Sequence, residues 1–141
     1  MTVMKRLKHW WQQRPGSDDR GDTSIQMAII FPFVVLATVA VIQVSMWFYA
    51  RQIALTAARE GLTAARSYQS SPADGAARTR EVLARTAGDS LVGYSISAGS
   101  DGQRVRVQVS GTAMSMIPGI SGLQVTQSAS GPVERWTEPA E

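Results

Sequence analysis

The sequence predicts an α+β protein in which one long N-terminal transmembrane helix extends into a small head. The head would combine a second helix with a three-stranded antiparallel sheet. Three observations support this fold class. Residues 23–50 carry no charge. Residues 51–87 repeat small or apolar side chains at helical spacing, with one break near residue 70. From Leu91 onward, apolar side chains alternate with polar ones, which is typical of strands.

The uncharged segment is long enough to cross a membrane. At ~1.5 Å per residue, a helix over residues 23–50 exceeds the ~30 Å hydrocarbon core. The aromatic cluster of residues 47–49, followed by Arg51, is typical of a membrane–water interface. A buried helix of a soluble protein is one alternative, but a chain of 141 residues has little else to cover it. A cleaved signal peptide is another, although its apolar core would span only ~7–15 residues.

The charges flanking this segment predict its orientation. Residues 1–22 contain five Lys or Arg, whereas Arg51, Arg59 and Arg66 follow the span. This bias favours a cytoplasmic N-terminus and an extracytoplasmic C-terminal domain in a single-pass protein of the cell membrane. Residues 1–21 would form a basic cytoplasmic leader or tail. Residues 51–141 carry nine Arg against eight Asp or Glu, so we expect no basic face for nucleic acid.

Beyond the predicted transmembrane helix of residues 22–50, residues 51–68 are expected to continue it outward. A stripe of small side chains recurs there at spacings of three and four. It consists of Ala54, Ala57, Ala58, Gly61, Ala64 and Ala65. Small residues let another helix or a sheet approach closely. Two uses therefore remain open, namely contact with helices of other subunits and packing on the chain's own head.

The head is expected over residues 69–130, beginning with a short helix. Ser71 suits an N-cap and Pro72 a first helical position. This helix should run to about Ala87 and end at Gly88. Its candidate core positions are Ala76, Val82, Leu83 and Ala87.

Three strands and a loop should complete the head. The first strand should turn Val92, Tyr94, Ile96 and Ala98 to one face, and the second Val105, Val107 and Val109. An Asp101–Gly102 pair predicts the turn between them. Residues 114–122 should form a loop with an apolar centre, followed by a third strand from Leu123 to about Ala129. Residues 131–141 would form a C-terminal tail.

No catalytic or metal-binding constellation is evident. Cysteine is absent, and the single histidine, His9, lies in the basic tail. This excludes a Cys-based site and a Ser-His-Asp triad from the head. The carboxylates are scattered, and there is no glycine-rich phosphate loop. We therefore expect neither enzymatic activity nor a cofactor.

Two residues within the span are unusual. Gln26 is polar, and Pro32 would leave the carbonyl of Ala28 without its helical partner and bend the axis. Each has an ordinary explanation, because membrane helices tolerate proline and Gln26 would lie at headgroup depth.

Taken together, these features resemble a known family. Residues 20–32 look like the N-terminal signature of TadE-like proteins, which are pilin-like components of the tight-adherence (Tad, or Flp) pilus system. Residues 47–52 and 57–61 resemble that family's exit from the membrane, and residues 129–136 resemble the ending of some members. The resemblance covers nearly the whole chain and is strongest over residues 20–61.

The resemblance implies a pilin-like fold and a role in pilus assembly. TadE-like proteins are similar to prepilins, whose leader is cut by a prepilin peptidase; the matching bond here is Gly21–Asp22. Gln26 would become the fifth mature residue, where the family usually has Glu. A glutamine can hydrogen-bond but cannot neutralise a neighbour's ammonium. Asp22 is also an unusual first residue. The implied partners are the lipid bilayer, other Tad pilin-like subunits, pilus assembly membrane proteins and a prepilin peptidase.

Two functions follow from the sequence. In the first, the chain is a minor pilin-like subunit, or an uncut membrane-held assembly factor, that acts by helix packing and scaffolding. In the second, it is a single-pass, membrane-tethered binding module whose extracytoplasmic head recognises a ligand.

Overall fold

The computed structural model describes residues 19–135, with only the backbone described for Asp19 and Arg20. Most of the expected basic leader and the end of the expected C-terminal tail, with Trp136, lie outside the described residues. The chain divides into two compact units, Met1–Ala40 and Val41–Glu141. We describe each unit by itself.

A single helix, α2 (Asp19–Arg66), covers 48 residues and runs through both units. It contains both the uncharged segment and most of its expected extension, and it continues past Pro32. Every residue from Gly21 to Thr38 is exposed. In the second unit, by contrast, one face of α2 is buried from Ala50 to Ala65.

The second helix, α3 (Pro72–Thr86), begins at the predicted cap. Ser71 has an extended backbone, its side chain accepts from the N–H of Asp74, and the Asp74 carboxylate accepts from the N–H of Ser71 at 2.7 Å. This reciprocal capping box satisfies two backbone donors that a helix start leaves free. Val82, Leu83 and Ala87 are buried as expected.

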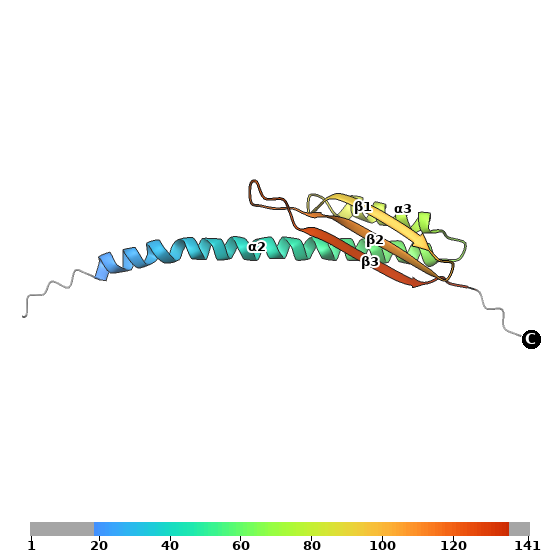
Figure 1. The fold of residues 1–141 in the computed structure, drawn as a ribbon, viewed down its shortest axis with the longest axis horizontal. Coiled ribbons are helices and arrows are strands. Elements are labelled where there is room, and N and C mark those ends of the chain that lie inside the picture. Colours follow the sequence, from blue (N-terminus) through green and yellow to red (C-terminus); the bar gives the residue numbers. More distant parts are fainter. Residues whose placement is uncertain (1–18, 136–141) are drawn as a thin grey trace, which may run out of the picture. The chain divides into compact units, whose positions relative to one another are not determined.

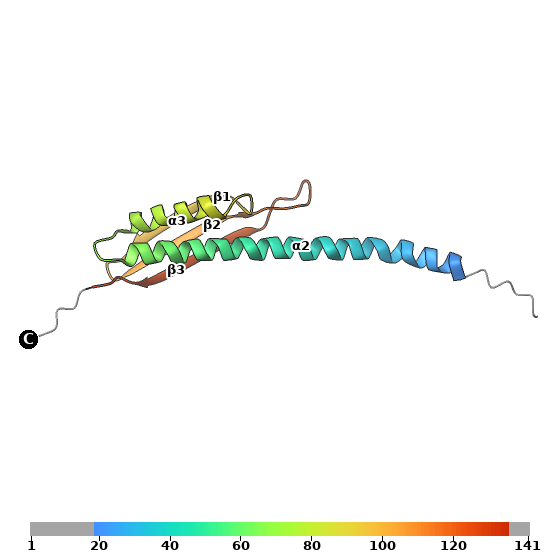
Figure 2. The same cartoon turned by 180° about the vertical axis from the view of Figure 1, so that it is seen from behind.

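The sheet is antiparallel with the order β1-β2-β3. Its strands are β1 (Leu91–Ser100), β2 (Arg104–Ala113) and β3 (Gln124–Pro132). The fold is therefore the predicted α+β arrangement of a long helix, a short helix and three antiparallel strands. In Figure 1 the open face of the sheet lies in front, and Figure 2 shows α3 and the second-unit part of α2 against the other face.

The predicted pattern of β1 is wrong at its start. Gly93 and Tyr94 together face the single residue Gly111, and Gly93 has a φ of 59°. This is a β-bulge, in which a glycine takes the left-handed conformation and one extra residue shifts the alternation. Leu91 is consequently buried, whereas Val92 is exposed.

The core lies between the sheet and the two helices. Val105, Val107 and Val109 point inward from the central strand and are buried against the small residues of α2 and against Leu83. Contacts with β3 hold α2 at two points. The Trp47 indole N–H donates to the carbonyl of Gln124 at 3.3 Å, and Arg66 Nε donates to the carbonyl of Pro132 at 2.7 Å. Between these points, helix and strand both advance by roughly 27–29 Å, so the two elements match in length.

Candidate membrane and assembly surface

The first part of α2 exposes a continuous apolar surface. Phe31 and Phe33 are each 68% exposed and Leu36 is 66% exposed. The best 18-residue window of the helix has a mean hydropathy of 2.5, and none of it is buried. Such a surface requires lipid or another protein as a partner. By length and composition α2 can cross a membrane, which fits a single-pass membrane protein.

Polar side chains within the apolar surface are largely satisfied by the helix itself. Thr38 donates to the carbonyl of Val34, and Ser45 donates to that of Val41, both at 2.8 Å. Such back-bonding to the preceding turn is how hydroxyl groups are accommodated in apolar helices. These two hydroxyls therefore need no partner from outside the chain.

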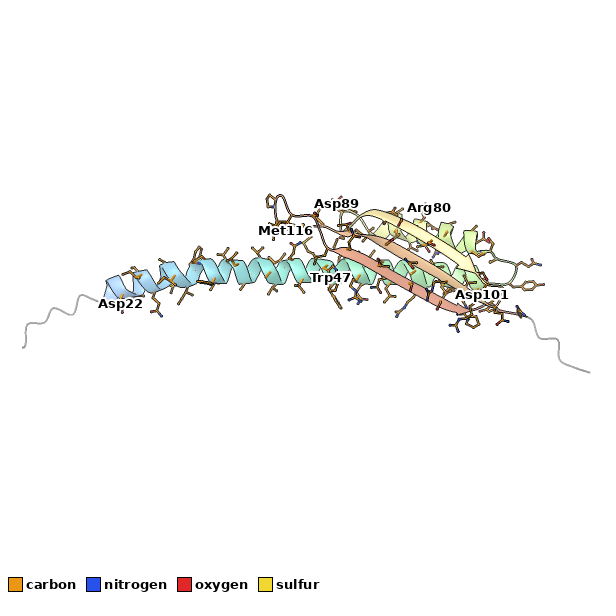
Figure 3. The ribbon with its side chains drawn as sticks, in the orientation of Figure 1. Asp22, Trp47, Arg80, Asp89, Asp101 and Met116 are labelled. Atoms are coloured by element: carbon orange, nitrogen blue, oxygen red, sulfur yellow. The ribbon has the colours of Figure 1, made fainter. Side chains whose placement is uncertain are left out.

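The residues of the implied processing site lie at the start of α2. Gly21, Asp22 and Gln26 are exposed, and the Gly21–Asp22 bond is within the first turns of the helix (Asp22 is labelled in Figure 3). A Cβ on Gly21 would meet nothing within 4 Å. Nothing in the described part of the chain therefore crowds this bond, but the bond is helical, so a peptidase would have to unwind it locally.

The small-residue stripe lies inside the head. Ala54, Ala57 and Ala58 are fully buried, Ala65 is 2% exposed, Gly61 is buried and Ala64 is half-buried. Their partners are α3 and the inner face of the sheet. Of the two uses left open by the sequence, packing on the chain's own head is the one that these residues serve in this structure.

The two helices α2 and α3 approach each other closely at Gly61 and Gly75. A Cβ on Gly61 would overlap Thr79 Oγ1 and lie 2.7 Å from the carbonyl oxygen of Gly75. Thr79 is fully buried, and its hydroxyl donates to Gly75 at 2.8 Å. Ala76 was one of the four candidate core positions of this helix, but it is only half-buried, whereas its neighbours Gly75 and Thr79 are buried. The presence of a glycine in each of the two helices, at positions 61 and 75, was the signal in the sequence that could have predicted this contact.

Arg66 joins the end of α2 to the C-terminal motif. Besides its bond to Pro132, its guanidinium lies 3.9 Å from the carboxylate of Glu134, whose backbone N–H donates to the Arg66 carbonyl. The segment that resembles the family's ending is thus attached to the last turn of the long helix.

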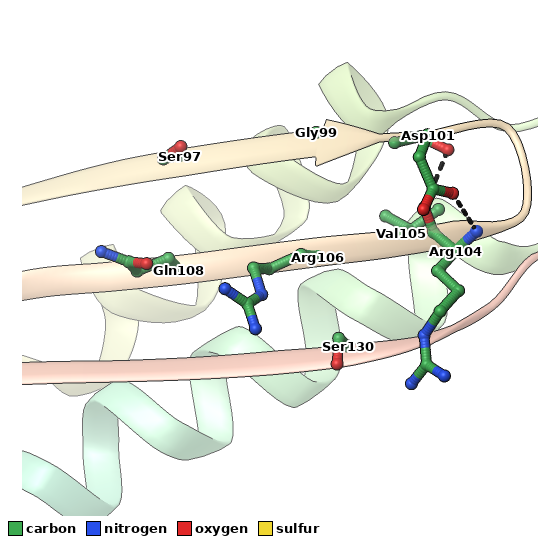
Figure 4. A pocket seen from close by; sticks show the side chains of 9 residues that line it. Ser97, Gly99, Asp101, Arg104, Val105, Arg106, Gln108 and Ser130 are labelled. Carbon is green, nitrogen blue, oxygen red and sulfur yellow. Dashed lines mark hydrogen bonds between the residues drawn. The ribbon is translucent and has the colours of Figure 1, made fainter.

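The outer face of the sheet is polar. A shallow depression of about 480 Å³ is lined by Ser97, Arg104, Arg106, Gln108 and Ser130 (Figure 4). At its rim, Asp101 accepts bonds from the N–H groups of Arg104 and Gln103 at 2.7 and 2.8 Å. These bonds lower the pKa of Asp101 below its usual value. The depression therefore presents two guanidinium groups beside hydroxyl and amide groups.

The loop between β2 and β3, residues 114–123, carries exposed apolar side chains next to α2. Met116 lies on this loop and Trp47 on the neighbouring helix (Figure 3). The Gln43 amide donates to the carbonyl of Met114, and its oxygen accepts from the N–H of Met116. The loop is thus attached to the helix inside the segment predicted to be transmembrane.

Comparison with protein families identifies what the first part of the chain resembles. A model of the family described as TadE-like protein matches residues 21–62. The chain is TadE-like over this segment. The match confirms the suspected resemblance over these residues and links the segment to Tad pilus systems. No curated protein and no solved structure matches significantly.

The TadE-like segment combines two surfaces of different kinds. It begins at Gly21, includes Gln26 and Pro32, and ends at Leu62 inside the head. Its first half is exposed and apolar, and its second half carries the buried stripe, up to Gly61, on one face. The matched segment thus covers both the exposed apolar part of α2 and the part of α2 that packs against the sheet and α3.

Proposed function

We propose that this chain is a structural component of a Tad-type pilus, either a minor pilin-like subunit or a membrane-held assembly factor. The observation that carries the proposal is the fully exposed apolar half of the TadE-like helix. A head of this size needs no such helix for its own stability, since its core draws on α2 only from Trp47 onward. The exposed half is therefore free to meet lipid and sibling helices.

The surface that packs against other subunits would be residues 25–44 rather than the small-residue stripe. Ala57 and its neighbours already contact the chain's own sheet and α3, so no second helix can reach them without opening the head. Scaffolding would thus use the bulky apolar side chains of the first half. Its partners would be the lipid bilayer, other Tad pilin-like subunits and pilus assembly membrane proteins, and its role would not be enzymatic.

The proposed topology places the N-terminus in the cytoplasm and the head outside it. The charge bias around the span supports this orientation. A prepilin peptidase would then meet the Gly21–Asp22 bond at the cytoplasmic edge. N-terminal sequencing of protein purified from cells with active peptidase separates the two forms of the proposal. A start at Asp22 supports a processed subunit, whereas an intact Met1 supports an uncut assembly factor.

Photocrosslinking in cells that carry the Tad system tests the assembly role. A photoreactive residue would be placed in turn at Phe33, Val34, Val35 and Leu36, so that every side of the helix is sampled. We expect at least one position to form an adduct with a pilin-like subunit or assembly protein. The matched control is Arg80, an exposed residue of α3, which should form none. Unchanged piliation and adhesion after deletion of the gene would overturn the proposal.

A second candidate function is a membrane-tethered binding module. The depression containing Arg104 and Arg106 favours it, because two guanidinium groups beside hydroxyls suit an anionic ligand. Replacing both arginines with glutamine should then abolish ligand binding while piliation persists. Under the assembly proposal, piliation depends on the exposed half of α2 and is insensitive to this double substitution.

A further inference from the structure

The loop of residues 114–123 has an unusual surface for an extracytoplasmic head. Met116 is 60% exposed, Ile120 57% and Leu123 52%, and Met114 is exposed as well. These four apolar side chains lie within ten consecutive residues. A cluster of exposed large apolar groups on one loop normally marks a contact surface.

No charge accompanies these side chains. From Val107 to Val133 the sequence contains no Asp, Glu, Lys or Arg. Pro118 lacks an amide hydrogen, and the N–H groups of Met114, Met116, Ile117 and Ile120 all donate within the chain. A segment can enter an apolar medium only when most of its backbone groups are already paired. This loop meets that condition at these four N–H groups and at the carbonyls of Met114, Ile117 and Leu123, which accept from Gln43, Ile120 and Ala113.

Gln43 fixes where the loop lies along α2. Its side-chain nitrogen is 3.4 Å from the carbonyl oxygen of Met114, and its side-chain oxygen is 3.2 Å from the nitrogen of Met116. One turn later, Trp47 donates to Gln124 at the start of β3. On the next turn, Arg51 lies 4.9 Å from the centre of the Trp47 ring. The loop therefore sits beside the last apolar turns of α2, before its first charge after the span.

The length of the apolar segment indicates what surrounds the loop. A transmembrane helix needs about 20 residues to cross ~30 Å of hydrocarbon. If the hydrocarbon begins at Thr23, it therefore ends close to Gln43. The remaining uncharged residues, with Trp47 and Tyr49, then occupy the interfacial region that favours aromatic side chains. The loop lies at this boundary.

We propose that the β2–β3 loop is a second membrane contact, whose apolar tip inserts into the interface of the bilayer that α2 crosses. The head is then attached to the membrane surface at two points, and its rotation about α2 is restricted. The amide of Gln43 satisfies two backbone groups that would otherwise face lipid. This inference rests on α2 spanning the membrane. Its test must therefore distinguish failure of the loop contact from failure of the span.

The absence of cysteine allows a direct measurement of depth. Single-cysteine variants of the full chain, Ile120→Cys, Val34→Cys and Gln103→Cys, would each carry an environment-sensitive fluorophore and be reconstituted into phosphatidylcholine–phosphatidylglycerol vesicles. Gln103 is an exposed residue of the β1–β2 turn, at the opposite end of the sheet from the loop. Quenching by spin-labelled lipids and by aqueous iodide would be compared for the three positions.

We expect the probe at residue 120 to be quenched by lipids labelled near the headgroup at least threefold more than the probe at residue 103, and to be protected from iodide. The probe at residue 34 should respond to lipids labelled deep in the acyl chain. If residue 34 responds but residue 120 is as open to iodide as residue 103, the loop proposal is wrong and the span stands. Protection of residue 120 from both quenchers would indicate a protein contact and would also overturn it. Failure at residue 34 would remove the span and the proposal together.

Discussion

Gly61 and Gly75 face each other across the contact between α2 and α3. A Cβ on either glycine would lie 2.7–2.8 Å from the carbonyl oxygen of the other. Backbone is therefore packed on backbone at this point, with Thr79 filling the space beside it. This contact brings the short helix close enough to the long one for both to cover the same face of the sheet.

Replacing Gly61 with Ala should destabilise the head. The added methyl group overlaps Thr79 and the Gly75 carbonyl, so the helices must separate, and overpacking of this kind costs about 1–3 kcal/mol. The measurement is thermal unfolding of the full chain in detergent. Gly99→Ala is the matched control, because a Cβ there meets nothing within 4 Å. Equal midpoints for the two variants would show that the contact is looser than described.

Replacing Ala57 with Leu should unfold the head, whereas Leu36→Ala should leave it folded. Ala57 is fully buried on the face of α2 that packs against the sheet, while Leu36 is 66% exposed. Protease resistance of the head in detergent distinguishes the two variants. We expect rapid cleavage within residues 69–130 only for Ala57→Leu. A folded head in that variant would mean that the stripe is not required for internal packing.

Gln43→Leu should loosen the β2–β3 loop. The substitution keeps the size of the side chain but removes two hydrogen bonds, each contributing about 0.5–1.5 kcal/mol. Hydrogen exchange of the Met116 amide should accelerate roughly tenfold or more in the reconstituted protein. The Val107 amide, in the middle of the sheet, is the internal control and should not change. Identical exchange at Met116 would argue against the contact with Gln43.

Acid should weaken the start of α3. The Ser71 hydroxyl and, to a smaller extent, the Ser71 backbone N–H donate hydrogen bonds to the Asp74 carboxylate. These bonds lower the pKa of Asp74 below its ordinary value. A lowered folded-state pKa means that the unfolded chain takes up the proton first. This contribution to stability is therefore present above about pH 4 and is lost as the pH falls through the folded pKa.

The measurement for Asp74 compares thermal midpoints in detergent at pH 7 and pH 2–3. Asn can still accept the bond from Ser71 but does not titrate, so Asp74→Asn should reduce the acid-induced fall in the midpoint. Asp101→Asn should act in the same direction, because the pKa of Asp101 is lowered as well. An unchanged pH dependence in the double variant would show that other groups cause the acid sensitivity.

Much of the fold follows from local rules that can be read along the chain. The uncharged run predicts α2, since few charge-free segments of this length occur outside membranes. Ser71 and Pro72 predict the start of α3 because capping depends on neighbouring residues alone. The alternation of Val105, Val107 and Val109 predicts the central strand and its buried face for the same reason.

Other features depend on contacts between distant residues, and only the tertiary structure decides them. The bulge at Gly93 reverses the face of Val92, because a single extra residue shifts the alternation of a strand. The partner of the small-residue stripe was open in the sequence, since small side chains suit any close neighbour, and the structure assigns it to the chain's own head. The attachment of residues 114–123 to Gln43 joins positions more than 70 residues apart. The sequence by itself thus determined a TadE-like apolar helix with an α+β head, whereas long-range packing decided which part of that helix remains free to meet lipid or other subunits.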